Sequence, residues 1–221
     1  MSDHDSGGLV VQAVQTMRTA LVCDVLDGLG LRSQALGADI CSLRPGRPVT
    51  GRAFTAVSRE VDETPEVPYV GLLRALDAVG HGDVFVLAAS RTERSAMWGE
   101  LLSTTCLARG VNGVVTDGYA RDTAQIAALG FPTYCRGTCP LDIHGRGEVT
   151  DHGVPVVIDG VVISPGDLIC ADDDGVVVVP ADIVEEVTVR AHAKAEDEGS
   201  FRQAVRGGML PSEAYDRFKV L

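Results

Sequence analysis

Two short segments carry residue types that could bind and activate a small acid, and we call them the polar segments because of Glu100 in the first and Arg121 and Asp122 in the second. The first, residues 98–102 (WGELL), follows an apolar run and opens a helical pattern. Free backbone N–H groups at the start of a helix bind anions, and the helix dipole favours negative charge there. Gly99 allows a ligand to approach the backbone closely. The alternative interpretation is an ordinary turn between a strand and a helix.

The second segment, residues 117–122, follows the next apolar run and ends with Arg121 beside Asp122. A carboxylate can bind a hard divalent cation, and a guanidinium can hold a carboxylate or enolate oxygen. The simpler interpretation is that Asp122 caps the helix that follows and that Arg121 lies on the surface. Taken together, anion-binding amides, an arginine and a metal-binding carboxylate suit a small 2-oxo acid bound with a divalent metal.

The elements that must position these segments alternate between strands and helices. Apolar runs predict strands, and helical stretches closed by glycine predict helices. In chain order these are strand 84–89, helix 100–109, strand 113–116, helix 122–129 and strand 131–135. Two consecutive crossovers require parallel strands in one sheet. Ligands collect at the carboxyl ends of such strands, which here are residues 90–99, 117–122 and 136–140.

The flanking regions predict a helical start, an antiparallel part and a helical end. The predicted helices are 9–22 with a stop at Gly28, 70–79, a long helix capped by Asp182 that ends near Glu198, and a short one after Pro211. Residues 32–51 predict a loop, 52–58 a strand, and 154–163 and 168–179 two hairpins, the first turning at Asp159-Gly160. We expect a tail at 1–8, one catalytic domain at 9–180 and a C-terminal helical segment at 181–221 that packs on a neighbouring subunit.

Composition makes several classes of protein improbable. The 221 residues carry a net charge of −12, which repels phosphate backbones and argues against direct nucleic-acid binding. Apolar runs are far shorter than a membrane-spanning helix, and the start lacks the pattern of a signal peptide. The six cysteines form no Cys-x-x-Cys pair, which predicts reduced thiols in a cytoplasmic protein. Residues 91–136 hold five Arg and four acids, so this window is locally cationic and suits a small anionic ligand.

The two polar segments, with 21 residues between Gly99 and Arg121, resemble the RraA-like family. This family contains class II pyruvate aldolases that act on 4-hydroxy-4-methyl-2-oxoglutarate and 4-carboxy-4-hydroxy-2-oxoadipate, and the regulator of ribonuclease activity A. The resemblance runs over most of the chain. Further matching segments are 23–26, 82–84, 113–118, 130–132, 136–138, 165–167 and 174–176.

The resemblance implies a compact layered αββα sandwich with a mixed parallel/antiparallel sheet core. It also implies a homotrimer or hexamer with active sites between subunits. Asp122 would bind Mg²⁺ or Mn²⁺, with Glu100 near the metal-bound waters, and Arg121 would contact the 2-oxo oxygen. The amides of Glu100, Leu101 and Leu102, next to Gly99, would hold the pyruvyl carboxylate. The outer-shell acid supplied by a neighbouring subunit would be Glu196 or Glu198.

The chemistry implied is that of a divalent-metal-dependent lyase. Cleavage of a 4-hydroxy-2-oxo acid of the 4-hydroxy-4-methyl-2-oxoglutarate type would give pyruvate and a 2-oxo acid through a metal-stabilised pyruvate enolate. Oxaloacetate decarboxylation passes through the same enolate. The catalytic residues would be Arg121, Glu100 and Asp122.

Two departures from the family pattern keep other functions open. Gln125 stands where family aldolases commonly carry an acid, and Arg91 and Arg94 occupy a loop that is rich in Gly and Asp in many relatives. These arginines could reach a distal carboxylate or phosphate of the substrate, or belong to a solvated loop. The alternatives are a non-catalytic binding protein like the ribonuclease regulator and a relative recruited to different enol or 2-oxo acid chemistry.

Overall fold

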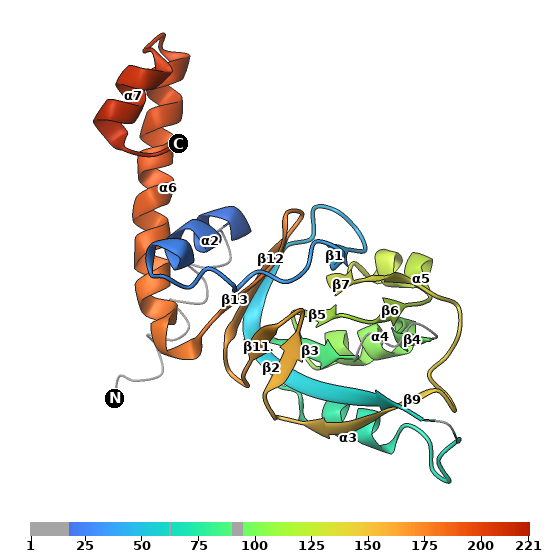
Figure 1. Ribbon diagram of the computed structural model, residues 1–221. Coiled ribbons are helices and arrows are strands. Elements are labelled where there is room, and N and C mark those ends of the chain that lie inside the picture. The colour runs from blue at the N-terminus through green and yellow to red at the C-terminus, as the bar shows by residue number, and fades with distance from the viewer. Residues whose placement is uncertain (1–17, 62, 90–94) are drawn as a thin grey trace, which may run out of the picture.

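A computed structural model describes residues 18–61, 63–89 and 95–221 (Figure 1). The predicted tail at 1–8, residues 9–17 of the helix predicted at 9–22, and Arg91 and Arg94 lie outside the described residues. Among the described residues, no helix combines the length and the apolar character needed to cross a membrane.

The centre of the molecule is a mixed eight-stranded sheet, which confirms the predicted fold class. Its strands run in the order β1-β7-β5-β3-β2-β12-β13, and β9 also pairs with β2. Their bounds are β1 Cys41–Ser42, β2 Val49–Glu60, β3 Asp83–Ala88, β5 Gly113–Thr116, β7 Thr133–Cys135, β9 Gly147–His152, β12 Leu168–Asp172 and β13 Gly175–Val179. Strands β2, β3, β5 and β7 are parallel to their neighbours within this set, and the remaining pairs are antiparallel.

The two predicted crossovers are confirmed. Helix α4 (Glu100–Ala108) leads into β5, and α5 (Thr123–Leu129) leads into β7. Strand β3 is apolar on both faces because both faces are covered. Phe85 and Leu87 pack in the cluster that includes Trp98, whereas Val84 and Val86 pack in a cluster with strands β10 (Val156–Ile158) and β11 (Val161–Ile163).

A second, smaller parallel sheet, which the sequence did not predict, joins the three segments expected at the ligand-binding edge. It consists of β4 (Ala96–Trp98), β6 (Tyr119–Ala120) and β8 (Gly137–Thr138), in that order. Each strand follows one strand of the large sheet in the chain. Asp117 adds a buried tie, because its carboxylate accepts a hydrogen bond from the Ala89 amide at 2.5 Å. The backbone around the predicted site is therefore held by regular hydrogen bonding and not by loops alone.

The antiparallel part follows the prediction closely. Strands β10 (Val156–Ile158) and β11 (Val161–Ile163) form a hairpin, and both residues of its turn, Asp159 and Gly160, have positive φ angles of 51° and 82°. Such a turn requires residues that tolerate the left-handed region, which Asp-Gly supplies. Strands β12 and β13 form the second hairpin. Helix α3 (Val70–Ala78) was also predicted and packs beside β9.

Two helix predictions near the chain ends are wrong in their bounds. Helix α2 is Thr19–Gly28, and Arg18 before it is extended, so this helix begins at Thr19 and not at residue 9. The start is set by a distant residue, since the Thr19 amide and hydroxyl donate to the Asp172 carboxylate at 2.8 and 2.6 Å. Residues 23–28, which we expected to close the helix, form its second half.

The long C-terminal helix begins later and ends later than predicted. A short 3₁₀ turn, η1 (Ala181–Ile183), precedes α6 (Val184–Arg206), so Asp182 does not cap the helix. Helix α7 (Pro211–Phe218) confirms the short helix predicted after Pro211, with the proline itself as its first residue. Figure 1 shows α6 beside α2, and both α6 and α7 extend away from the large sheet. The predicted contact of this segment with a neighbouring subunit stays a prediction.

Candidate active site

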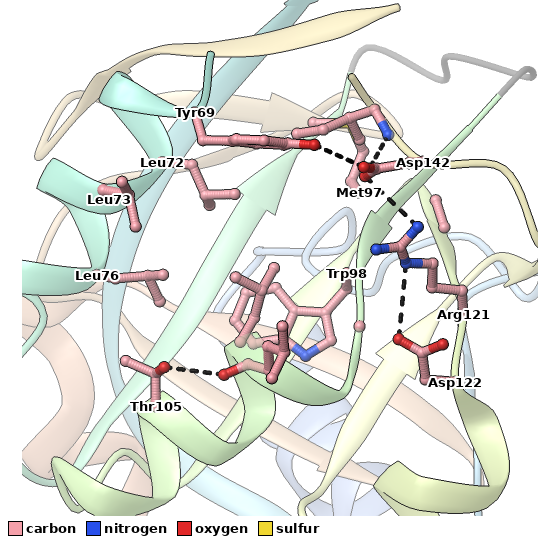
Figure 2. A pocket seen from close by; sticks show the side chains of 15 residues that line it. Tyr69, Leu72, Leu73, Leu76, Met97, Trp98, Thr105, Arg121, Asp122 and Asp142 are labelled. Atoms are coloured by element: carbon pink, nitrogen blue, oxygen red, sulfur yellow. Dashed lines mark hydrogen bonds and ion pairs between the residues drawn. The ribbon is translucent and has the colours of Figure 1, made fainter. Parts of the chain in front are cut away.

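A pocket of about 360 Å³ lies where α3, the start of α4 and the β4–β6 sheet meet (Figure 2). This volume is within the range of roughly 300–1,000 Å³ that is typical of small-molecule sites. The lining residues are Tyr69, Leu72, Leu73, Leu76, Ala96, Met97, Trp98, Gly99, Leu101, Leu102, Thr105, Arg121, Asp122, Asp142 and Ile143. The structure thus brings both predicted polar segments to one pocket.

The start of α4 is rigidly anchored at the pocket wall. Gly99 is the N-cap residue, and Ser103 donates from both its amide and its hydroxyl to the Gly99 carbonyl at 3.1 Å. The buried Trp98 indole donates to the Ser103 hydroxyl at 2.9 Å. Because the Ser103 amide makes the first intrahelical bond, the amides of Leu101 and Leu102 precede it and have no intrahelical acceptor. This is the geometry in which a helix start binds an anion.

Asp122 directs its carboxylate at this helix start and not at its own helix. It occupies the N-cap position of α5, but its side chain makes no capping hydrogen bond, so the capping interpretation is wrong for this carboxylate. Its Oδ2 lies 3.3 Å from the Glu100 amide nitrogen, which donates to it. The backbone of Asp122 has φ 56° and ψ 37°, in the left-handed region that aspartate tolerates better than most residues with a side chain. This backbone conformation lets the helix begin while the carboxylate faces the start of α4.

Arg121 is held between two carboxylates. Its amide donates to the Trp98 carbonyl at 2.9 Å, which fixes the backbone within the small sheet. Its guanidinium lies 3.6 Å from Asp122 Oδ2 through Nε and 3.6 Å from Asp142 Oδ1 through Nη1. About a third of the side chain is exposed, so Arg121 lines the pocket and is not a free surface arginine.

Tyr69 and Asp142 belong to this site, although the sequence did not reveal them. The Tyr69 hydroxyl donates to Asp142 Oδ2 at 2.6 Å, and the Ile143 amide donates to Oδ1 at 2.8 Å. The hydrogen bond to Asp142 raises the pKa of Tyr69 above its ordinary value. Tyr69 also has a positive φ of 65°, which aims its ring at the pocket from the start of α3. Nothing in their local sequence marks either residue, because Asp142 meets Arg121 only through the fold.

The remaining predicted residues take other positions. The Glu100 side chain is outside the lining and accepts a hydrogen bond from Thr104 at 2.7 Å. Gln125 is an exposed residue of α5 that does not line the pocket. In the C-terminal helix, Glu198 pairs with Arg18 and Arg202 of the same chain, whereas Glu196 is exposed.

The donor set is compatible with a hard cation held mainly by water. Within the described ranges, no three His, Cys, Asp or Glu side chains cluster as a preformed metal cage. Mg²⁺ does not need one, since it is commonly bound by one or two carboxylates and keeps several waters. Asp122 supplies a carboxylate with 42% of its side chain exposed, at the pocket wall. This residue fits such a cation, and its role as a ligand stays a prediction.

Comparison with known proteins gives a consistent picture. A model of the RraA-like family, described as Aldolase/RraA, matches residues 19–178. The chain is 32% identical over 201 residues to a protein of Halalkalibacterium halodurans named "Putative 4-hydroxy-4-methyl-2-oxoglutarate aldolase", covering 91% of this chain and 90% of that protein. It is 28% identical over 216 residues to Protein DlpA of Legionella pneumophila, covering 98% of this chain but only 35% of the longer relative.

A solved structure is similar along most of its length. It is Streptomyces coelicolor RraAS2, described as an unusual member of the RNase ES inhibitor RraA protein family. The TM-score is 0.81 at 32% identity, over 89% of this chain and 98% of that one. The residues that the family model matches include Gly99, Arg121 and Asp122 of the pocket.

Proposed function

Because the chain belongs to the RraA-like family, we propose that it is a lyase that releases pyruvate from a 4-hydroxy-2-oxo acid. The substrate would be of the 4-hydroxy-4-methyl-2-oxoglutarate type, and the second product a 2-oxo acid. One observation carries the proposal. The α4 amides, the Arg121 guanidinium and the Asp122 carboxylate line one pocket, as a 2-oxo acid requires.

Different groups of the protein bind different parts of the substrate. The amides of Leu101 and Leu102 receive the C1 carboxylate at the helix start. Arg121 faces the C2 oxygen, where negative charge develops as the bond breaks. The C4 hydroxyl loses its proton to a base, C4 becomes a carbonyl, and the C3–C4 bond breaks. Its electron pair forms the pyruvate enolate, which is protonated at C3 to give pyruvate.

The positions of Arg121 and Asp122 determine how strongly the developing enolate is stabilised. A divalent cation, Mg²⁺ or Mn²⁺, held by Asp122 would supply Lewis-acid polarisation of the 2-oxo group. Arg121 adds a positive charge, and the carboxylates of Asp122 and Asp142 hold its guanidinium group in one orientation. A preorganised charge of this kind needs little rearrangement during the reaction. Oxaloacetate decarboxylation uses the same enolate with carbon dioxide as the departing group, so we include it in the proposal.

The test is pyruvate release from a panel of substrates. Purified protein with Mg²⁺ is mixed with 4-hydroxy-4-methyl-2-oxoglutarate, 4-carboxy-4-hydroxy-2-oxoadipate or oxaloacetate, and pyruvate is followed with lactate dehydrogenase. We expect turnover that EDTA abolishes and that Arg121→Ala reduces by about two to three orders of magnitude. Full activity in EDTA, or no pyruvate from any substrate, would contradict the proposal.

The similarity to RraAS2 supports a second candidate, a non-catalytic inhibitor of a ribonuclease. An inhibitor needs a complementary surface but no pocket in which Asp122 and Arg121 face a helix start. The pyruvate assay separates the two functions, because a pure inhibitor releases no pyruvate and its binding is insensitive to Arg121→Ala.

We also propose a homotrimer or hexamer whose C-terminal helix reaches a neighbouring site. Of the two acids considered, Glu196 is the better candidate, since Glu198 is paired within its own chain. Light scattering of the intact protein gives the assembly, and Glu196→Gln tests the residue. A monomer with full activity would overturn this part.

A further inference from the structure

The pocket has a charged side and an apolar side. Figure 2 shows Arg121, Asp122 and Asp142 on one side, and Leu72, Leu73 and Leu76 projecting from α3 on the other. Leu101 and Leu102 at the start of α4 extend the apolar wall. The two sides belong to one continuous pocket, so a ligand held by Arg121 extends toward the leucines.

We call Leu72, Leu73, Leu76, Leu101 and Leu102 the leucine wall, and two of these side chains are part of the hydrophobic core. Leu72 and Leu76 are 4% and 3% exposed and belong to the main core cluster, which fixes them in place. Leu73, on the same helix, also lines the pocket and is 56% exposed. Binding becomes more favourable when an alkyl group of the ligand covers such an apolar surface and removes it from water.

The leucine side of the pocket offers little to a carboxylate on the C4 substituent of the substrate. Arg121 is the single positively charged residue among the described residues that line the pocket, and it already faces two carboxylates. Tyr69 reinforces this arrangement, because its hydroxyl holds Asp142 in place beside the guanidinium. A substrate carboxylate placed against the leucines would lose water without gaining a counter-charge from the described residues that line the pocket, which is costly.

We propose that the substituent on C4 of the substrate is an alkyl group of several carbons and not a carboxyalkyl group. The second product would then be a 2-oxo acid with an apolar side chain. This inference rests on the proposed function and narrows its substrate class. It runs against the idea that Arg91 or Arg94 binds a distal carboxylate, and the two can be separated by experiment.

The experiment uses two substrates that differ in a single group. Both have the 4-hydroxy-2-oxoglutarate skeleton, with either propyl or 2-carboxyethyl on C4, and 4-hydroxy-4-methyl-2-oxoglutarate serves as the reference. Cleavage gives pyruvate with 2-oxopentanoate or with 2-oxoglutarate. We expect kcat/KM to be at least about tenfold higher for the propyl substrate. Equal values, or a preference for the carboxyethyl substrate, overturn the inference.

A variant tests whether the leucine wall causes the preference. Leu73→Lys places an ammonium group at the half-exposed position on α3. We expect the preference to shift toward the carboxyethyl substrate by about tenfold or more. The matched control is Leu107→Lys on α4, which is 41% exposed and does not line the pocket, and which should leave the preference unchanged.

The outcomes distinguish the inference from the proposed function. If the reference substrate and both test substrates give no pyruvate, the lyase proposal fails and the inference fails with it. If the reference is cleaved but the propyl substrate is not preferred, the inference alone fails. If Leu73→Lys and Leu107→Lys change the preference equally, the wall is not its cause. The comparison of substrates on the unaltered protein does not depend on either variant folding.

Discussion

Adding one methyl group at Gly99 should disable the site while leaving the fold intact. A Cβ built on Gly99 meets Asp122 Oδ2 at 2.9 Å and Arg121 Cγ at 3.4 Å. The first distance is too short, so the Asp122 carboxylate must move by about half an ångström to reach ordinary contact. The atom that moves is the end of a flexible side chain, and the backbone of Gly99 (φ −155°, ψ −176°) is open to alanine. The cost to the fold is therefore small.

The cost to catalysis should be large. Misplacement of a reacting group by about 1 Å can lower a rate by about 100-fold, so we expect kcat for pyruvate release to fall by about ten- to 100-fold in Gly99→Ala. Stability should change by less than about 1 kcal/mol, because alanine also reduces the entropy of the unfolded chain. The assay combines pyruvate release, Mg²⁺ titration of activity and thermal melting.

Gly28→Ala is the matched control. Gly28 is the last residue of α2, and a Cβ there meets nothing within 4 Å. Alanine should change stability by less than about 1 kcal/mol, with unchanged activity. Gly99→Ala with wild-type kcat and wild-type Mg²⁺ dependence would refute the reasoning, since the Asp122 carboxylate would then not need its present position.

Three further predictions follow from the contacts described above. Arg121→Lys should lower kcat by about two to three orders of magnitude in the pyruvate assay, because one ammonium cannot match a guanidinium that lies 3.6 Å from each of two carboxylates; a rate within threefold of wild type would contradict this. Tyr69→Phe should cost about 1 kcal/mol by losing the bond to Asp142. Since that bond raises the Tyr69 pKa, the loss is complete below pH ~10 and shrinks as pH rises through the folded pKa; a melting difference that stays constant up to pH 12 would argue against it. Burial raises the pKa of Cys170 to about 12, so iodoacetamide at pH 8 should label exposed Cys41 first, and equal labelling in the folded protein would be the opposite result.

The strand–helix pattern was predictable because it rests on local chemistry. The run at 84–89 is apolar on both faces, and the structure covers both faces of β3. The glycines after α4 and α5, Gly110 and Gly130, have φ angles of 73° and 70°, which only glycine adopts readily. From these elements alone, the carboxyl edge could be named as the place where the two polar segments meet.

What the sequence did not reveal depends on contacts between distant residues. Helix α2 starts at Thr19 because Asp172 accepts its hydrogen bonds. The three-stranded β4-β6-β8 sheet pairs segments that are each two or three residues long, too short for a strand pattern. The ion pair between Arg121 and Asp142 also joins residues that are far apart in the sequence, so no local pattern predicts it. The helix at 70–79 was predictable, but the place of its leucines at the pocket depends on how α3 packs.

The role of Asp122 carries the central claim, and an isosteric substitution tests it most directly. Asp122→Asn keeps the size and shape of the side chain but removes its charge, so the hydrogen bond from the Glu100 amide can remain. The measurement is the rate of pyruvate release from 4-hydroxy-4-methyl-2-oxoglutarate across a Mg²⁺ titration, for wild type and variant. We predict that wild type releases pyruvate in a Mg²⁺-dependent manner and that Asp122→Asn is at least about 100-fold slower with an unchanged melting temperature. Equal rates for the two proteins would contradict the account.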